Sequence, residues 1–135
     1  MHTAVVIAVL GAESTGKTTL ARDLSRRLAD DTGLRVACVS RSGALPAVAD
    51  VPPEVAARWH AVRADVTKPQ ELREACTGVA AQGWRLVGLV NNAGVHLDGA
   101  SADFALSQWD EVMDTNATSV VAACQAVYPH LVSAG

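Results

Sequence analysis

The sequence has little of the features that mark several other classes of protein. None of its apolar runs approaches the roughly 18 residues that a membrane-spanning helix needs. Only 19% of the 135 residues are charged, and the net charge of −3 gives no excess of Lys and Arg for nucleic acid or anionic lipid. The N-terminus lacks the basic segment of a signal peptide. These absences indicate a cytoplasmic protein that binds neither nucleic acid nor a membrane.

Cysteine and histidine are also sparse. Cys38, Cys76 and Cys124 are an odd number without the spacing of metal ligands, and each lies in an apolar segment. We therefore expect buried, reduced thiols. The four histidines are scattered, and we expect surface or loop positions for them: His2, His60, His96 and His130.

What the sequence does contain is an alternation of strands and helices. Half of the residues are apolar, and the length suits one domain over residues 1–135. Continuous apolar runs predict strands at 4–10, 34–40, 59–64 and 85–90. Helical periodicity and caps predict helices at 17–30, 53–58, 69–82 and 107–132. This order predicts an α/β fold with a parallel sheet.

The two later helices have candidate caps and faces. Thr67 is positioned to cap the helix over 69–82, and Ser107 to cap the helix over 107–132. We expect Asp110, Glu111 and Asp114 to form a solvated face near the start of that helix. Its apolar face is expected to contain Trp109, Val112, Met113, Val120, Cys124 and Val127.

A phosphate-binding motif follows the first strand. Residues 11–18 match G-x-x-x-x-G-K-[ST] at every fixed position, and the motif opens the first helix. Backbone N–H groups in such a turn cradle phosphate oxygens, Lys17 reaches the β- and γ-phosphates, and the Thr18 hydroxyl binds Mg²⁺. The predicted phosphate-binding residues are Gly11, Ser14, Thr15, Gly16, Lys17, Thr18 and Thr19.

The first 40 residues resemble P-loop ATPases of the nicotinamide-riboside-kinase type. Such a protein needs a second acidic group at the end of a strand to hold the metal. The fourth strand ends in Asn91 and Asn92, so Asp65 after the third strand is the only good candidate. The resemblance implies Mg-ATP or ADP as the ligand.

From about residue 36 onward the chain resembles the short-chain dehydrogenases/reductases. Arg41 follows the second strand, where that family often places a basic residue beside the 2′-phosphate of NADP. Asp65, Val66 and Thr67 resemble the family's Asp-hydrophobic-Thr motif, in which the acid contacts adenine. Residues 91–94 match its Asn-Asn-Ala-Gly motif, which implies cofactor contacts for Asn92, Ala93 and Gly94. The helix over 107–132 resembles the one that bears the family's catalytic Asn, here Asn116.

Two departures separate the chain from that family. Thr15 and Lys17 occupy positions where the family's T-G-x-x-x-G-x-G loop has glycine, and side chains there hinder dinucleotide binding. The catalytic Ser and the Tyr-x-x-x-Lys pair are absent, because Tyr128 has Val132 four residues on. We expect Tyr128 to be a packing residue, Asn116 to be vestigial and dehydrogenase activity to be absent.

The leading interpretation is an engineered or recombined chimera, joined near residues 36–41 and truncated after its fourth helix. It would be a de novo nucleotide-binding protein that holds ATP or ADP phosphates through the Walker A loop, with weak ATPase activity at most. One alternative is an incomplete short-chain dehydrogenase fragment that retains affinity for NADP(H). Another is a scaffold without a ligand.

The second resemblance also implies an arrangement of the sheet. Residues 41–135 dominate the chain, so we expect a Rossmann-like three-layer αβα fold with strand order 3-2-1-4. In that order the fourth strand is an uncovered edge, and edges invite pairing. We therefore expect a homo-oligomer, formed through the fourth strand or through the helix over 107–132, with a small-molecule nucleotide as ligand.

Overall fold

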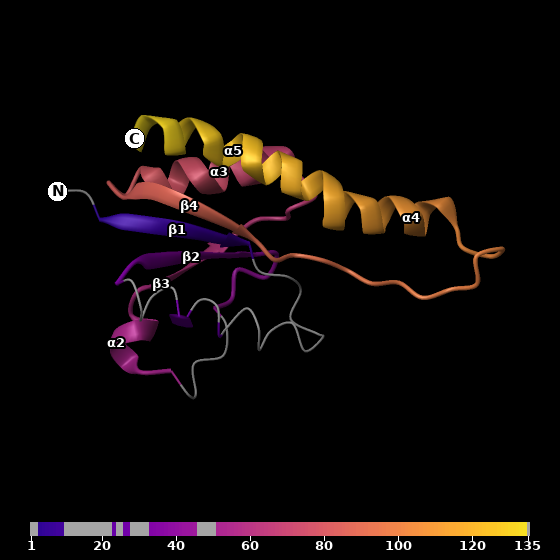
Figure 1. Cartoon of the computed structure of the whole chain (residues 1–135), viewed down its shortest axis with the longest axis horizontal. Helices are drawn as coiled ribbons and strands as arrows, with labels where there is room; N and C mark the ends of the chain where they lie inside the picture. Colours follow the sequence, from indigo (N-terminus) through magenta and orange to yellow (C-terminus); the bar gives the residue numbers. More distant parts are fainter. Residues whose placement is uncertain (1–2, 10–22, 24–25, 28–32, 46–50, 135) are drawn as a thin grey trace.

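The fold is built on a four-stranded parallel sheet. The computed structural model describes residues 3–9, 23, 26–27, 33–45 and 51–134. The strands are β1 (Ala4–Val9), β2 (Arg35–Ser40), β3 (Trp59–Arg63) and β4 (Arg85–Asn91). They lie in the order β3-β2-β1-β4, and every neighbouring pair is parallel (Figure 1). The predicted Rossmann-like order 3-2-1-4 is confirmed.

The central strands are buried on both faces, which explains their continuous apolar sequences. In β1, the side chains of Val5, Ile7 and Val9 join the core under α3 and α5. Ala8 points to the other face and packs with Val36, Cys38, Val51, Val55 and Trp59. Every residue from Val5 to Val9 is at most 5% exposed. Neither face of β1 is therefore available to solvent.

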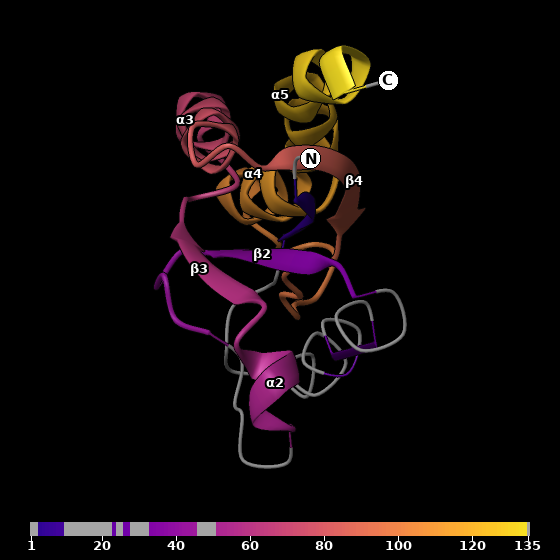
Figure 2. The same cartoon turned by 90° about the vertical axis from the view of Figure 1, so that its left-hand side faces the viewer.

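Helices cover both faces of this sheet. Figure 2 shows α3 (Pro69–Ala80) and α5 (Ser119–Ala134) side by side on one face, with α2 (Pro53–Ala56) on the other. Of the predicted helix over 17–30, the structure describes only Asp23, Arg26 and Arg27, and all three are helical. Within the described part of the chain, no helix combines the length and apolar character needed to cross a membrane.

The start of α3 differs from the prediction. Its N-terminal cap is Lys68, and no side chain caps the helix. Thr67 instead donates hydrogen bonds from its backbone N and its Oγ1 to Oδ1 of Asp65, at 2.9 and 2.6 Å. A local turn between residues two apart therefore uses the hydroxyl that the pattern assigned to the helix. Pro69 in the first turn starts the helix without a cap bond.

The predicted single helix over 107–132 is divided into two. It comprises α4 (Leu106–Met113), a π-helical turn η1 (Asp114–Thr118) and α5. Ser107 does not cap it, because Ala105 is the N-cap and its backbone N–H donates to Oε1 of Gln108 at 3.1 Å. The α4 helix and the extended segment before it project beyond the sheet (Figure 1).

The apolar face expected for this helix is also wrong in part. Trp109, Met113 and Cys124 are exposed, and Tyr128 is 66% exposed and not a packing residue. The face of α5 against the sheet consists of small residues and one valine: Ala122, Ala123, Ala126 and Val127. Small side chains on this face allow the helix to approach its neighbours closely. The larger apolar residues of α5 lie on the outer face: Val121, Tyr128 and Val132. Cys38 and Cys76 are buried as expected.

His60 lies in an aromatic and cationic cluster, not in the surface or loop position that we expected. A terminal guanidinium nitrogen of Arg35 lies 2.9 Å from Nε2 of His60, and the imidazole packs on the Trp84 ring with centroids 4.2 Å apart. The guanidinium carbon of Arg35 is 5.2 Å from the Trp84 ring centroid. Because Arg only donates hydrogen bonds, Nε2 must accept. His60 is therefore neutral, with its proton on Nδ1.

This cluster makes the stability of the fold sensitive to acid. Burial, together with the adjacent Arg35 charge, lowers the pKa of His60 from its ordinary value of 6.5. The unfolded chain then binds the proton more readily than the folded one, so stability is full above pH 6.5 and falls as the pH drops through the lowered pKa. We expect the melting temperature to fall over this range, and less so in His60→Gln, whose amide oxygen accepts from Arg35.

The matched control is His130→Gln, because the His130 side chain makes no hydrogen bond or ion pair with other described residues. Scanning calorimetry between neutral and mildly acidic pH provides the measurement. Identical pH profiles for the wild type and His60→Gln would contradict the role of the Arg35–His60 contact.

Candidate functional site

The candidate site lies where the parallel strands end. A cavity of about 230 Å³ opens beside the carboxyl ends of β2, β3 and β4, and residues after each of these strands line it together with residues of α4 and η1. Its lining consists of Arg41, Ala64, Asp65, Val66, Thr67, Ala93, Gly94, Val95, Glu111 and Thr115. In open parallel sheets, ligands bind outside the carboxyl ends of the strands, near the point where the strand order reverses.

Asp65 is the main hydrogen-bond acceptor of the cavity. Its hydrogen bonds from Thr67 lower the pKa of the carboxyl group, and the charges of Lys68 and Arg41 lower it further against the opposing effect of burial. The carboxylate is therefore ionised at neutral pH. The turn that holds it also orients it, since both Thr67 bonds go to Oδ1.

Arg41 is an exposed cation in the lining of the cavity, directly after β2, and its charge acts on Asp65. A tight turn follows it, in which the backbone N–H of Gly43 donates to Oγ of Ser40 at 3.1 Å. Gly43 has a positive φ of 72° and lies against Arg63, so a side chain at this position would be strained and crowded.

The segment after β4 is held by Asn116. The Asn116 Oδ1 accepts from the backbone N of Val95 at 2.7 Å, and its Nδ2 donates to the Val95 carbonyl at 2.8 Å. The Asn116 side chain in η1 thus makes the two hydrogen bonds to the Val95 backbone that a neighbouring strand would otherwise make. This contact connects η1 to the lining of the cavity, and it fixes the path of the backbone next to Ala93 and Gly94.

Asn92 has an unsatisfied donor. Its backbone N donates to the carbonyl of Val9 at 3.0 Å, which extends the pairing of β1 and β4 by one residue. Its Nδ2 atom is buried and has no hydrogen-bond partner among the described residues. A buried donor without a partner is costly, so this atom is a candidate ligand contact.

The structure describes only part of the predicted phosphate and metal site. Residues 11–19 lie outside the described residues. The order β3-β2-β1-β4 places β2 between β1 and the strand that precedes Asp65, so Asp65 is not brought beside the end of β1 as a P-loop metal site requires. Among the described residues, no group of three or more His, Cys, Asp or Glu side chains is arranged to hold a metal ion.

Four residues of the cavity are not among the predicted site residues, and the first of them, Ala64, directly precedes Asp65. Val95 and Thr115 are contributed by an extended segment and a π-helical turn, for which the sequence carries no local signal. Glu111 was expected on a solvated helix face, and it is exposed, yet it also lines the cavity. Val95, Glu111 and Thr115 come close to the strand ends only because of how the segment after β4, α4 and η1 pack beside the sheet, and no local sequence pattern indicates this packing.

The comparisons identify the family. The model of the short chain dehydrogenase family matches residues 6–135. The chain therefore belongs to the short-chain dehydrogenases/reductases.

Particular relatives fall within the same class. The chain is 41% identical over 81 residues to the 3-alpha-(or 20-beta)-hydroxysteroid dehydrogenase of Mycobacterium tuberculosis, covering 59% of this chain and 30% of that protein. It is 31% identical over 115 residues to the 3-oxoacyl-(acyl-carrier-protein) reductase FabG of Staphylococcus epidermidis, covering 83% of this chain and 46% of that one.

Solved structures agree with this assignment. A short-chain type dehydrogenase/reductase from Mycobacterium marinum superposes with a TM-score of 0.78 at 26% identity, covering 97% of this chain and 51% of that chain. A short-chain dehydrogenase/reductase from Serratia marcescens gives a TM-score of 0.69 at 25% identity, with coverages of 96% and 53%. The chain thus spans about half the length of these two structures.

These findings correct the leading functional prediction. The family match includes residues 11–19 and runs through the join expected near residues 36–41. The comparisons give no evidence for a P-loop kinase segment, so ATP binding through a Walker A loop is wrong as the main function, and Mg-ATP and the chimera are unsupported. Both families place phosphate at a Gly-rich turn before the first helix, so the motif alone does not separate them.

The Asn116 contact predicts a measurable effect on stability. Asn116→Ala removes both hydrogen bonds to Val95, and we expect the free energy of unfolding to fall by about 1–2 kcal/mol. Amide hydrogen exchange at Val95 should accelerate by more than the global change explains. Thr118→Ala in the same exposed turn is the control and should change neither quantity, whereas an unchanged Val95 exchange rate in Asn116→Ala would refute the link.

Proposed function

We propose that the chain is the cofactor-binding part of a short-chain dehydrogenase and that it binds NADP(H) without turning over by itself. The observation that carries this proposal is the cavity beside the carboxyl ends of the strands, whose lining includes the ionised Asp65, Val66 and Arg41. The family membership supports a nicotinamide dinucleotide as the ligand.

The base-binding end of the cavity fits adenine. Asp65 offers a carboxylate acceptor, and the backbone N–H of the next residue, Val66, makes no hydrogen bond with any other described residue. Adenine presents an amine donor beside a ring-nitrogen acceptor on its pairing edge, so an adjacent acceptor and donor in the protein are complementary to it. A 6-oxopurine presents an oxygen acceptor beside a ring N–H donor, so its oxygen would face the carboxylate and its N–H would face the backbone N–H.

The cation of the cavity fits a 2′-phosphate. Arg41 follows β2, and its guanidinium makes no hydrogen bond or ion pair with other described residues. A fork of five donors suits a phosphate dianion, and the charge-assisted bonds are stronger than neutral ones. We therefore propose a preference for NADP(H) over NAD(H).

The Nδ2 donor of Asn92, which has no partner among the described residues, fits the same ligand. This atom lies where β1 and β4 end side by side, close to the point where the strand order reverses. A dinucleotide placed across that point would offer acceptor oxygens to it. Asn92, Ala93 and Gly94 are the residues that would border the cofactor there.

Turnover is not expected from these 135 residues. A nicotinamide dinucleotide would supply the hydride chemistry, and the accompanying proton transfer would need a positioned acid or base. Tyr128 is the only tyrosine, it lies exposed on α5, and Val132 stands where a lysine partner would be needed.

The preference for NADP(H) is tested by substitution at Arg41. We expect Arg41→Ala to weaken NADP⁺ binding by about tenfold, because a charge-assisted contact is lost, and to leave NAD⁺ binding unchanged. Isothermal titration calorimetry measures both affinities. The control is Arg73→Ala, since Arg73 lies on α3 and bonds Gln70 through Nε at 3.1 Å. Equal losses for the two cofactors, or no binding to the wild type, would overturn the proposal.

We also propose that two chains associate through the outer face of α4 and α5, and not through β4. This face carries a stripe of exposed apolar residues at helical spacing: Leu106, Trp109, Met113, Val121, Tyr128 and Val132. A stripe of this extent on a helix is typical of an interaction surface. The chain has no Lys or Arg after Arg85, so no basic side chain on this face would oppose the packing of a second copy.

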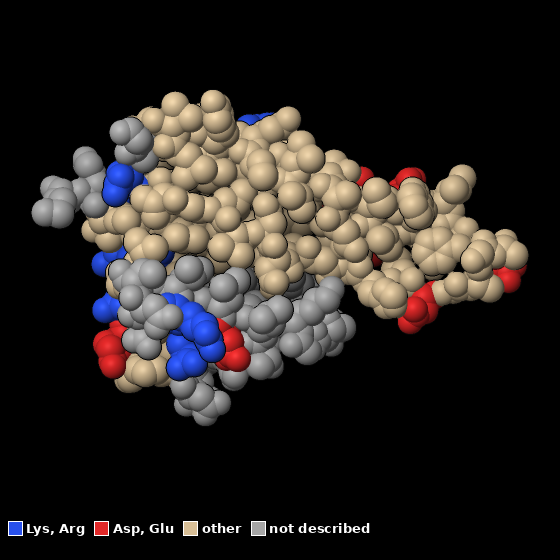
Figure 3. Space-filling view, viewed as in Figure 1, with Lys and Arg blue, Asp and Glu red and all other residues tan. Residues whose placement is uncertain are grey.

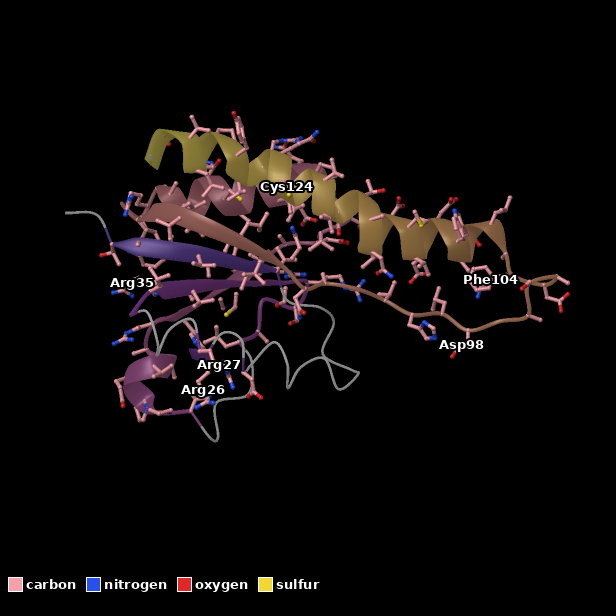
Figure 4. All side chains as sticks on the ribbon, viewed as in Figure 1. Arg26, Arg27, Arg35, Asp98, Phe104 and Cys124 are labelled. Atoms are coloured by element: carbon pink, nitrogen blue, oxygen red, sulfur yellow. The ribbon has the colours of Figure 1, made fainter. Side chains whose placement is uncertain are left out.

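The charges favour an antiparallel arrangement. The acidic residues of the helices lie in α4 and η1, at Asp110, Glu111 and Asp114, whereas α5 has no Asp, Glu, Lys or Arg. The projecting end of the molecule shows Asp and Glu without Lys or Arg, whereas the visible Lys and Arg lie elsewhere, some of them beside further acidic residues (Figure 3). Figure 4 likewise places Asp98 and Phe104 on the projecting arm and Arg35 at the far end of the sheet. Antiparallel pairing keeps the acidic halves apart.

The association is tested by a charge placed in the stripe. We expect a dimer for the wild type by light scattering at micromolar concentration and a monomer for Val121→Asp, because Val121 is 58% exposed and lies in the middle of the stripe. Thr77→Asp on α3, an exposed position away from the stripe, should remain dimeric. A monomeric wild type, or a dimeric Val121→Asp, would contradict this interface.

A further inference from the structure

Glu111 is a second carboxylate of the cofactor cavity. It projects from α4 and lines the same space as Asp65, which comes from the turn after β3. Its carboxylate makes no hydrogen bond or ion pair with any other described residue. By contrast, Oδ1 of Asp65 already accepts two hydrogen bonds from Thr67.

The helix gives no reason for an acid at this position. Leu106 is the first residue of α4, so Glu111 lies beyond the first turn, which contains no acidic residue. The positive end of the helix dipole acts mainly on the first turn. Asp110 and Asp114 are acidic as well, and Asp114, three residues on, is a like-charged neighbour on the helix surface that disfavours another carboxylate there. Of these three acids, only Glu111 lines the cavity.

The chemistry of adenine provides a partner for two carboxylates. Its exocyclic amine has two hydrogens, both donors, and the ring carries no acceptor on the far side of that amine other than N7. One hydrogen suffices for Asp65, and the second is left without an acceptor unless another group supplies one. Glu111 comes from α4 and Asp65 from the turn after β3, and both line the one cavity.

We propose that Glu111 accepts the second hydrogen of the adenine amine and determines, together with Asp65, the selection of an aminopurine over a 6-oxopurine. This inference rests on the proposed function, because it concerns the base of the same dinucleotide. A 6-oxopurine would place an oxygen between two carboxylates and its ring N–H against the N–H of Val66. Both contacts are repulsive, so the hypoxanthine analogue is disfavoured at two points.

The test compares two cofactors that differ only in this group. The dissociation constants of NADPH and of its hypoxanthine analogue are measured by calorimetry on the 135-residue chain, and their ratio defines the discrimination. We expect Glu111→Gln to lower the discrimination by about tenfold, because the amide of glutamine donates to the oxygen of hypoxanthine. NADPH itself should bind Glu111→Gln somewhat more weakly, and the analogue more tightly.

The control is Glu74→Gln on α3, which removes one negative charge outside the cavity and should leave the ratio unchanged. An unchanged ratio in Glu111→Gln, with NADPH still bound by the wild type, would overturn the role of Glu111 and leave the proposed function standing. No binding of NADPH to the wild type would instead overturn the proposed function, and the inference with it. A lowered ratio in Glu74→Gln as well would attribute the effect to net charge and also overturn the inference.

Discussion

The burial of β1 on both faces is the constraint on which the rest of this structure depends. β1 pairs with β2 on one side and β4 on the other, and its side chains enter both cores. A strand buried in this way must have parallel neighbours whose connections cross the faces of the sheet as helices. That requirement brings the carboxyl ends of all four strands to one edge of the sheet, and the candidate site is at that edge.

Short turns position two of the polar residues that line the site. Asp65 is oriented by a two-residue turn, and Arg41 is presented by the turn that Gly43 permits. The segment after β4 is held by long-range contacts, because the backbone N of Asn92 donates to the Val9 carbonyl and Asn116 bonds Val95 through both its amide atoms. A cavity assembled from three strand ends and a helical arm is therefore sensitive to a change in any one of these connections.

Much of this arrangement was predictable. The strand boundaries agree with the apolar runs to within a residue or so, since a strand buried on both faces has a distinctive sequence. Asp65, Val66, Ala93, Gly94 and Arg41 were named in advance, and they do line one cavity. The Walker A reading failed because a phosphate loop before a first helix is shared by different families, and a local motif carries no information on strand order.

The sequence by itself determined the elements, the parallel character of the sheet and the residues at the strand ends, because these follow from local periodicity and from side chains near one another in the chain. Only the tertiary structure decided the break at η1, the outward direction of Trp109 and Tyr128, the Arg35–His60–Trp84 cluster and the entry of Glu111 into the cavity. Each of these depends on contacts between residues distant in the chain, and such contacts leave no local pattern from which they can be read.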